Sequence, residues 1–124
     1  MKLLDSNILI YAAEPGQEAL RERILAEPAG VSVATMVEVP GYHLLTGEEE
    51  ADLRGLLSDL TIFAADIVVA ERAVVLRQER RMGLGDAIIA ATALVHGLTL
   101  VTRNVDDFKH VAGLKLMNPF APTA

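Results

Sequence analysis

The sequence predicts an α/β domain in which a mostly parallel sheet is flanked by helices. Short apolar runs alternate with longer segments of helical period along the 124-residue chain, and no internal repeat interrupts them. Hydrophobic residues make up 52% of the chain, which is enough for a substantial core. The length suits one domain, so we expect a single unit over residues 1–124.

Five short apolar runs predict the strands of this sheet. Each is only a few residues long and is bounded by polar or turn-forming residues, as is typical of short buried strands. The strands are expected at 2–5, 31–33, 61–63, 98–102 and 114–117, with one helical turn in the loop at 104–110.

Prolines and glycines bound the first helices. A helix is expected over 6–13, before Pro15, and a second over 17–27, before Pro28. These two helices lie between the first and second strands in the chain, as in an alternating α/β pattern.

The middle of the chain predicts two further helices. Pro40 falls within the helix expected over 35–45 and predicts a kink or a break there. Thr46 and Glu49 have the spacing of a capping box, and leucines at helical period continue from there to residue 60.

The last two helices are separated by a glycine-rich break. Asp66 is positioned to cap a helix running to about residue 82, and Gly83 and Gly85 then interrupt the pattern. The segment 86–96 is apolar nearly all round, which predicts a central, buried helix.

The composition excludes several classes of protein. The chain has no cysteine, so disulfide frameworks, thiolate metal sites and thiol nucleophiles are excluded, and a cytoplasmic location is expected. Asp5 and Asn7 interrupt the first apolar stretch, and no apolar run reaches the ~20 residues of a membrane span, so neither a secretory signal nor a membrane helix is expected. A net charge of −6 argues against a passive nucleic-acid-binding protein.

Three acidic residues stand where a parallel sheet places its functional crevice. Asp5 ends the first strand, Glu38 follows the second by a few residues, and Asp86 opens the apolar helix. Each alone has an ordinary explanation, namely capping for the two aspartates and a solvated helix face for the glutamate. Because the crevice of such a sheet lies at the carboxyl ends of its strands, the three acids are expected to converge.

Converging carboxylates repel one another and raise each other's pKa unless a cation compensates. A set of oxygen donors without cysteine favours Mg²⁺ or Mn²⁺, and carboxylate-held ions of this kind hydrolyse phosphodiesters by activating water. We therefore predict metal-dependent phosphodiester hydrolysis in which Asp5, Glu38 and Asp86 bind the ion and are catalytic.

The order of these motifs resembles the PIN-domain family, and most closely the VapC-type toxin ribonucleases. The resemblance covers essentially the whole chain and is carried by Asp5-Ser6-Asn7, Glu38, residues 83–91 with Asp86, Thr102-Arg103-Asn104, Asp107-Phe108 and Asn118-Pro119-Phe120. It implies a three-layer α/β/α sandwich and Mg²⁺- or Mn²⁺-dependent cleavage of RNA by the toxin of a toxin–antitoxin pair. It also implies a homodimer and an antitoxin partner that inserts a segment into the acidic groove.

The resemblance also implies roles for neighbouring residues. Ser6 matches a position whose hydroxyl supports the first aspartate, Asp5. The fourth acidic position of the family is matched here by Asn104, which can ligate through its amide oxygen but carries no charge. Asp107 or Asp106 is the alternative source of that charge. The asparagine puts a second metal ion in doubt more than the first.

Three arginines are candidates for contact with RNA phosphates. Arg80 and Arg81 precede the glycine break, and Arg103 lies in the Thr-Arg-Asn motif. An alternative role for Arg103 is to tether its loop by a salt bridge.

Other functions remain open at this point. The uncharged Asn104 supports a catalytically impaired PIN-like module that acts through protein contacts, and a PIN ribonuclease of RNA processing outside a toxin–antitoxin system fits the same motifs. A phosphate-transfer enzyme with Asp5 as nucleophile is disfavoured, because the second aspartate of an Asp-x-Asp motif is Asn7 here.

Overall fold

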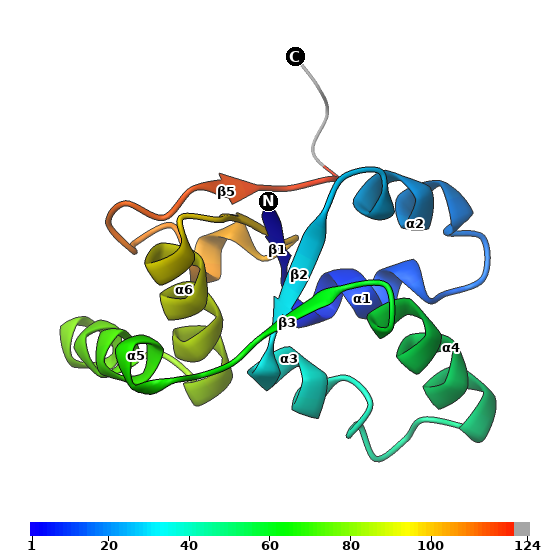
Figure 1. Ribbon diagram of the computed structural model, residues 1–124, viewed down its shortest axis with the longest axis horizontal. Helices are drawn as coiled ribbons and strands as arrows, with labels where there is room; N and C mark the ends of the chain where they lie inside the picture. Colours follow the sequence, from blue (N-terminus) through cyan, green and yellow to red (C-terminus); the bar gives the residue numbers. More distant parts are fainter. Residues whose placement is uncertain (121–124) are drawn as a thin grey trace.

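A five-stranded sheet forms the centre of the protein in a computed structural model that describes residues 1–120 (Figure 1). The strands are β1 (Lys2–Leu4), β2 (Ala29–Ser32), β3 (Thr61–Phe63), β4 (Thr99–Val101) and β5 (Leu116–Met117). Their order is β3-β2-β1-β4-β5, and every neighbouring pair is parallel. The predicted parallel sheet is therefore confirmed.

Helices cover both faces of this sheet. On one side lie α5 (Ile67–Glu79) and α6 (Leu84–His96), and on the other lie α1 (Ser6–Ala12), α2 (Glu18–Leu25) and α4 (Gly47–Leu57) (Figure 1). Leu3 and Leu4 of β1 point to opposite faces, because successive side chains alternate along a strand. Leu3 packs in the core cluster that contains residues of α5 and α6, and Leu4 in the cluster that contains residues of α1, α2 and α4. The three-layer α/β/α sandwich is thus confirmed.

The remaining helix, α3 (Val33–Glu38), is shorter and starts earlier than predicted. Ser32 caps it by accepting a hydrogen bond from the backbone N–H of Ala34 at 3.0 Å, so β2 ends at Ser32 and does not continue to residue 33. The prediction of a helix to residue 45 is wrong, because Pro40 has no N–H to continue the hydrogen-bond ladder. The break predicted at Pro40 is what the chain adopts.

Local capping signals mark two helix starts as predicted. Thr46 and Glu49 form the reciprocal capping box of α4. The backbone N–H of Glu49 donates to Thr46 Oγ1 at 3.1 Å, and the backbone N–H of Thr46 donates to Glu49 Oε1 at 3.0 Å. Asp66 accepts a hydrogen bond from the backbone N–H of Val69 at 3.0 Å and so caps α5. These interactions span three residues, which is why sequence spacing alone reveals them.

The start of α6 differs from the prediction. The helix begins at Leu84 with Gly83 as its N-cap, so Asp86 lies in the first turn and does not cap the helix. The helix ends at Gly97, which adopts the left-handed conformation (φ 66°) that terminates helices. The carboxylate of Asp86 is therefore available for another role.

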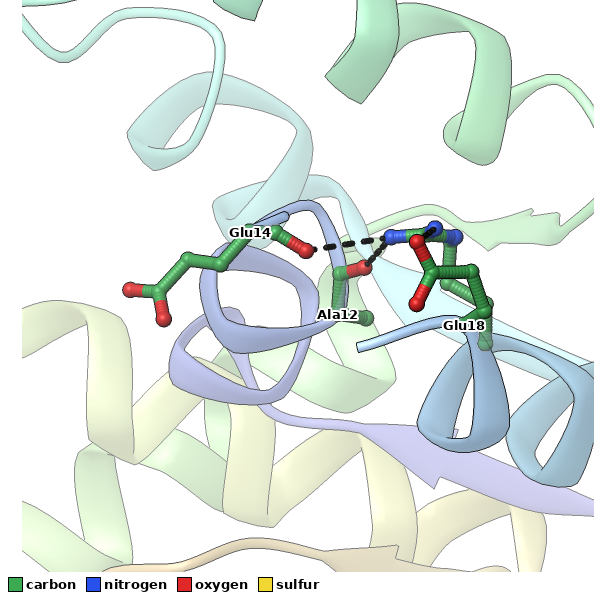
Figure 2. Close-up of polar contacts among 4 residues, drawn as sticks. Ala12, Glu14 and Glu18 are labelled. Atoms are coloured by element: carbon green, nitrogen blue, oxygen red, sulfur yellow. Dashed lines mark hydrogen bonds and ion pairs between the residues drawn. The ribbon is translucent and has the colours of Figure 1, made fainter. Parts of the chain in front are cut away.

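Arg21 of α2 holds the end of α1. Its guanidinium donates to the backbone oxygens of Ala12 and Glu14 and pairs with Glu18 Oε1 at 3.4 Å (Figure 2). The last turn of α1 carries no basic residue of its own, so Arg21 supplies donors that its terminal carbonyls lack. Within residues 1–120, no helix has the length and apolarity to cross a membrane.

Candidate metal centre

Asp5 lies at the carboxyl end of β1 and is 4% exposed. Its Oδ1 accepts a hydrogen bond from the backbone N–H of Ser6, and its Oδ2 accepts one from the Thr102 hydroxyl, each at 2.8 Å. The parallel register pairs Leu4 of β1 with Val101 of β4, and Asp5 and Thr102 are the residues that directly follow this pair. Strand pairing therefore sets this hydrogen bond between residues far apart in the chain.

Glu38 is the last residue of α3 and lies near Ser6. The hydroxyl of Ser6 donates to Glu38 Oε1 at 3.4 Å and lies 3.0 Å from Thr35 Oγ1. The sequence-based expectation that this hydroxyl supports Asp5 is therefore not met. Ser6 is the first residue of α1, so its backbone N–H is free to bind Asp5 while its hydroxyl turns toward Glu38.

Asp86 reaches the site from the first turn of α6 and is half-buried. The preceding residue, Gly85, lies against the carboxylate of Glu38: a Cβ at Gly85 would lie 2.8 Å from Glu38 Oε1. The acid of α3 and the first turn of α6 are therefore in direct contact.

The pKa values of Asp5 and Glu38 depend on burial, on hydrogen bonds and on the charges of neighbouring acids. Burial raises the pKa of Asp5, hydrogen bonds from Thr102 and Ser6 lower it, and the charges of Glu38 and Asp107 raise it further. Burial and the charge of Asp86 raise the pKa of Glu38, against the lowering effect of the Ser6 hydroxyl.

The pKa of Asp86 is raised by burial and then by the charges of Asp5 and Asp107. Carboxylates from β1, α3, α6 and the segment after β4 thus act on one another, as is expected of acids in one crevice. The predicted convergence of Asp5, Glu38 and Asp86 is supported by these mutual interactions.

The segment after β4 contributes Asn104 and Asp107. The backbone N–H of Asn104 donates to Thr102 Oγ1 at 3.0 Å, and a 3₁₀ turn, η1 (Val105–Asp107), follows. Asp106 and Asp107 are both exposed and both line the hollow beside Asp86. Asp106 forms an ion pair with Lys109 at 3.0 Å, and the charge of Asp107 contributes to raising the pKa of Asp5 and of Asp86.

The donor chemistry fits a hard divalent cation. The donors are carboxylate and amide oxygens, and a cation among them would relieve the repulsion that raises their pKa values. Across residues 1–120, no group of three or more acidic or histidine side chains is already arranged to hold an ion. The acids are therefore not preassembled around an ion in this structure, and binding would require adjustment of side chains among them.

Two of the three candidate arginines adjoin this site. Arg80 and Arg81 line a hollow of about 230 Å³ together with Asp86 and Asp107. Cations and acids thus face the same space, which is the arrangement that an RNA phosphate next to a metal ion requires. A larger hollow of about 460 Å³ lies elsewhere, at α1, α2 and α4, and none of the site acids lines it.

Arg103 is held by aromatic rings. Its guanidinium carbon lies 4.8 Å from the ring centroids of both Tyr11 and Phe120. Among residues 1–120 these cation–π contacts, and no salt bridge, hold the Arg103 side chain. The hydroxyls of Thr35 in α3 and of Thr102 after β4 had no predicted role, because their contacts with Ser6 and Asp5 join separate elements.

The whole arrangement is that of a known class of protein. The PIN-domain family model matches residues 2–114, and the chain therefore belongs to the PIN-domain family. It is 35% identical to Ribonuclease VapC10 of Mycobacterium tuberculosis, over 98% of this chain and 94% of that protein. It is 27% identical to the tRNA(fMet)-specific endonuclease VapC of Shigella flexneri, over 91% of this chain and 93% of that protein.

The fold comparison agrees with the sequence comparison. A chain of a toxin–antitoxin complex from Klebsiella pneumoniae matches with a TM-score of 0.76 and 36% identity, covering 98% of this chain and 100% of that one. FitAcB from Neisseria gonorrhoeae matches with a TM-score of 0.79 and 26% identity, covering 98% and 100%. The resemblance to VapC-type PIN domains seen in the sequence is confirmed.

Proposed function

We propose that this protein is a divalent-metal-dependent endoribonuclease of the cytoplasm and the toxin of a toxin–antitoxin pair. The observation that carries the proposal is the packing of acids from three separate segments: Ser6 hydrogen-bonds both Asp5 and Glu38, and Gly85, the neighbour of Asp86, lies against the Glu38 carboxylate. Ribonuclease relatives that align with nearly the whole chain support the substrate class.

The proposed role of each residue as a metal ligand follows from its burial. A bound Mg²⁺ or Mn²⁺ would supply an activated water for attack on the phosphodiester. Asp5 is the fixed ligand, because Thr102 and Ser6 hold both of its oxygens in place. Glu38 and Asp86 complete the set from more exposed positions, and Asn104 and Asp107 are weaker ligands.

Local cations compensate for the negative charge of the protein as a whole. Arg80 and Arg81 line the hollow next to Asp86 and would contact the RNA backbone there. Arg103 is a third candidate, with its guanidinium already ordered between two rings. The protein has a net charge of −6, so binding of RNA phosphates would depend on the local positive charge of these arginines.

The central test is Mn²⁺-dependent cleavage of RNA by purified protein. Asp5→Ala and Asp86→Ala should abolish cleavage and retain the circular dichroism spectrum of the folded chain. Asp59→Ala is the matched control, because Asp59 is exposed and lies outside the acidic site. Cleavage at the unmodified rate by either site variant would reject the proposal.

A catalytically impaired PIN module is the second candidate. The uncharged Asn104 favours it, as does the absence, within residues 1–120, of acids already arranged around an ion. Calorimetric titration separates the two. Failure of the protein to bind Mg²⁺ or Mn²⁺ at millimolar concentration selects the impaired module, and binding selects the enzyme.

An antitoxin partner is proposed from the fold comparison. The matching chain from Klebsiella pneumoniae is described as part of a toxin–antitoxin complex. A basic segment of the partner would occupy the acidic groove and exclude the ion and the RNA. A short adjacent reading frame whose purified product suppresses cleavage would support this. An isolated gene with no such neighbour would favour a role in RNA processing.

We also propose a homodimer through α5. Ile67, Val68, Val74 and Val75 on this helix are 71%, 58%, 49% and 41% exposed, a large apolar stripe for a free surface. A second copy covers it with the same stripe. Light scattering should give a dimer for the wild type and a monomer for Val74→Glu. Leu25→Glu on α2 is the control and should stay dimeric, and a monomeric wild type would contradict the proposal.

A further inference from the structure

The first turn of α6 contacts the carboxylate of Glu38 at one glycine. A Cβ placed on Gly85 would lie 2.8 Å from Glu38 Oε1, 3.0 Å from its Cδ and 3.1 Å from its Oε2. These three nearest atoms make up a single carboxylate. The carboxylate of Glu38 therefore fills the space that a side chain at position 85 would occupy.

Backbone conformation does not explain a glycine at position 85. The glycines with positive φ in residues 1–120 are Gly16, Gly97 and Gly113, whereas Gly85 is an ordinary helical residue of α6. Glycine within a helix is disfavoured relative to alanine by about 1 kcal/mol. Close approach of another group is the remaining physical reason for glycine here.

Gly83, two residues earlier, lacks the close contact that Gly85 makes. It is the N-cap of the same helix, and a Cβ there would meet nothing within 4 Å. The two glycines, two residues apart, thus differ in the space beside them as well as in helix position: only the space beside Gly85 holds a carboxylate of the acidic site.

Contacts from two sides hold the Glu38 carboxylate in this position. The Ser6 hydroxyl of α1 donates to Oε1 at 3.4 Å, and Gly85 of α6 lies on the other side. The atoms next to Gly85 are the far end of the long Glu38 side chain, so they can be displaced without moving the helix backbones. A methyl group at position 85 would therefore move the carboxylate and leave the fold intact.

We propose that Gly85 is a positioning residue for the metal site, because its missing side chain lets the carboxylate of Glu38 lie beside Asp86 in the first turn of α6. Any side chain at position 85 displaces this carboxylate and weakens binding of the divalent cation. The inference rests on the proposed function, since the cation is part of that proposal.

The test compares Gly85→Ala with Gly83→Ala by calorimetric titration with Mn²⁺ and by thermal unfolding without metal. Gly85→Ala should weaken Mn²⁺ binding at least about tenfold, as loss of a supporting contact to a ligand does. Its Tm should stay equal or rise, because alanine favours the helix. Gly83→Ala should bind Mn²⁺ as the wild type does and lose a little stability, because alanine is a poor N-cap.

A shorter acid at position 38 provides a rescue that a merely structural role would not. Glu38→Asp alone should weaken Mn²⁺ binding, because the carboxylate is withdrawn by one methylene. In the Gly85→Ala background the same change should strengthen binding relative to Gly85→Ala alone, because it makes room for the new methyl group. A crystal structure of Gly85→Ala should show the Glu38 carboxylate displaced from α6.

The outcomes distinguish a failure of the positioning role of Gly85 from a failure of the proposed metal-dependent enzyme. If the wild type and Gly85→Ala bind Mn²⁺ equally well, Gly85 has no positioning role and the metal site stands. The same conclusion follows if Glu38→Asp weakens binding in both backgrounds. If the wild type binds no Mn²⁺, the proposed enzyme fails and the inference fails with it.

Discussion

A buried carboxylate such as Asp5 is ionised only if its surroundings replace the water that it loses. The Thr102 hydroxyl and the Ser6 backbone N–H each donate to it at 2.8 Å, and both lower its pKa against the effect of burial. The Thr102 hydroxyl also accepts from the backbone N–H of Asn104 at 3.0 Å. One hydroxyl thus orients the principal acid and the loop that carries the fourth position of the site.

Replacement of Thr102 by valine should therefore impair both stability and metal binding. The side chain is fully buried, so Thr102→Val leaves Asp5 Oδ2 and the Asn104 N–H without their partner. We expect the free energy of unfolding to fall by about 1–3 kcal/mol and Mn²⁺ affinity to fall as the pKa of Asp5 rises further. Urea denaturation and calorimetry measure the two effects. Thr102→Ser keeps the hydroxyl and should resemble the wild type, so equal Mn²⁺ binding by the valine and serine variants would contradict this role.

Neutralising Asp86 should separate stability from activity. Burial, and then the charges of Asp5 and Asp107, raise the pKa of Asp86, so ionised Asp86 destabilises the metal-free protein at neutral pH. Asp86→Asn should raise Tm at pH 7.5 by about 2 °C or more and abolish RNA cleavage. Asp59→Asn, at an exposed acid outside the acidic site, is the control and should leave Tm nearly unchanged. A lower Tm for Asp86→Asn would contradict this destabilisation.

At the scale of elements, the loop after β4 is positioned by aromatic residues from early and late in the chain. Tyr11 of α1 and Phe120 near the C-terminus pack edge to face at 5.6 Å, and the guanidinium of Arg103 lies against both rings. Arg23 of α2 donates to the backbone oxygen of Pro119 at 3.1 Å and fixes the segment that carries Phe120. The loop after β4 is thus connected to α1 through Tyr11 and to α2 through the segment that carries Phe120.

Loss of the Phe120 ring should loosen this junction. Phe120→Ala removes one cation–π contact, worth ~0.5–1 kcal/mol at an exposed site, and one aromatic pair, worth ~0.5–1.5 kcal/mol. We expect the free energy of unfolding to fall by about 1–2 kcal/mol, measured by urea denaturation at unchanged m value. Phe120→Tyr retains the ring and should keep the wild-type value. An equal loss in both variants would show that the ring contacts are not responsible.

At the scale of the whole molecule, the acidic site couples folding to pH and to metal. The folded-state pKa values of Asp5, Glu38 and Asp86 lie above the ordinary 3.8 of aspartate and 4.5 of glutamate. The folded state therefore binds protons more tightly than the unfolded state, and these groups stabilise the fold increasingly as pH falls through the raised values. Glu18 and Glu49 have lowered pKa values and act in the opposite sense, with a contribution that is lost only as pH falls through those lowered values.

Metal-free protein should accordingly have a higher Tm at pH 5.5 than at pH 7.5. Mn²⁺ at a hundredfold excess over its Kd should stabilise the protein at pH 7.5 by about 2.7 kcal/mol, and by less at pH 5.5 because protons compete for the same oxygens. Scanning calorimetry at both pH values, with Mn²⁺ or with EDTA, measures this. A Mn²⁺ effect that is independent of pH would show that the raised-pKa acids are not the ligands.

The sequence by itself determined the alternation of strands and helices and the capping of α4 and α5, and it singled out the three acids that we propose as metal ligands. Those features depend on interactions within a few residues, such as Thr46 with Glu49, or on a periodicity that one segment displays alone. The bounds of α3 and α6 were predicted less well, because Ser32 and Gly83 are caps that compete with neighbouring signals.

Only the tertiary structure decided how the acids are held. Thr102 and Asp5 are 97 residues apart in the chain, and their hydrogen bond exists because β1 and β4 pair in one register. The position of Asp106 and Asp107 beside Asp86 and the contact of Gly85 with Glu38 likewise depend on how separate elements pack. Local rules specify the elements, whereas the distances between distant oxygens follow from strand pairing and helix packing, which no single segment encodes.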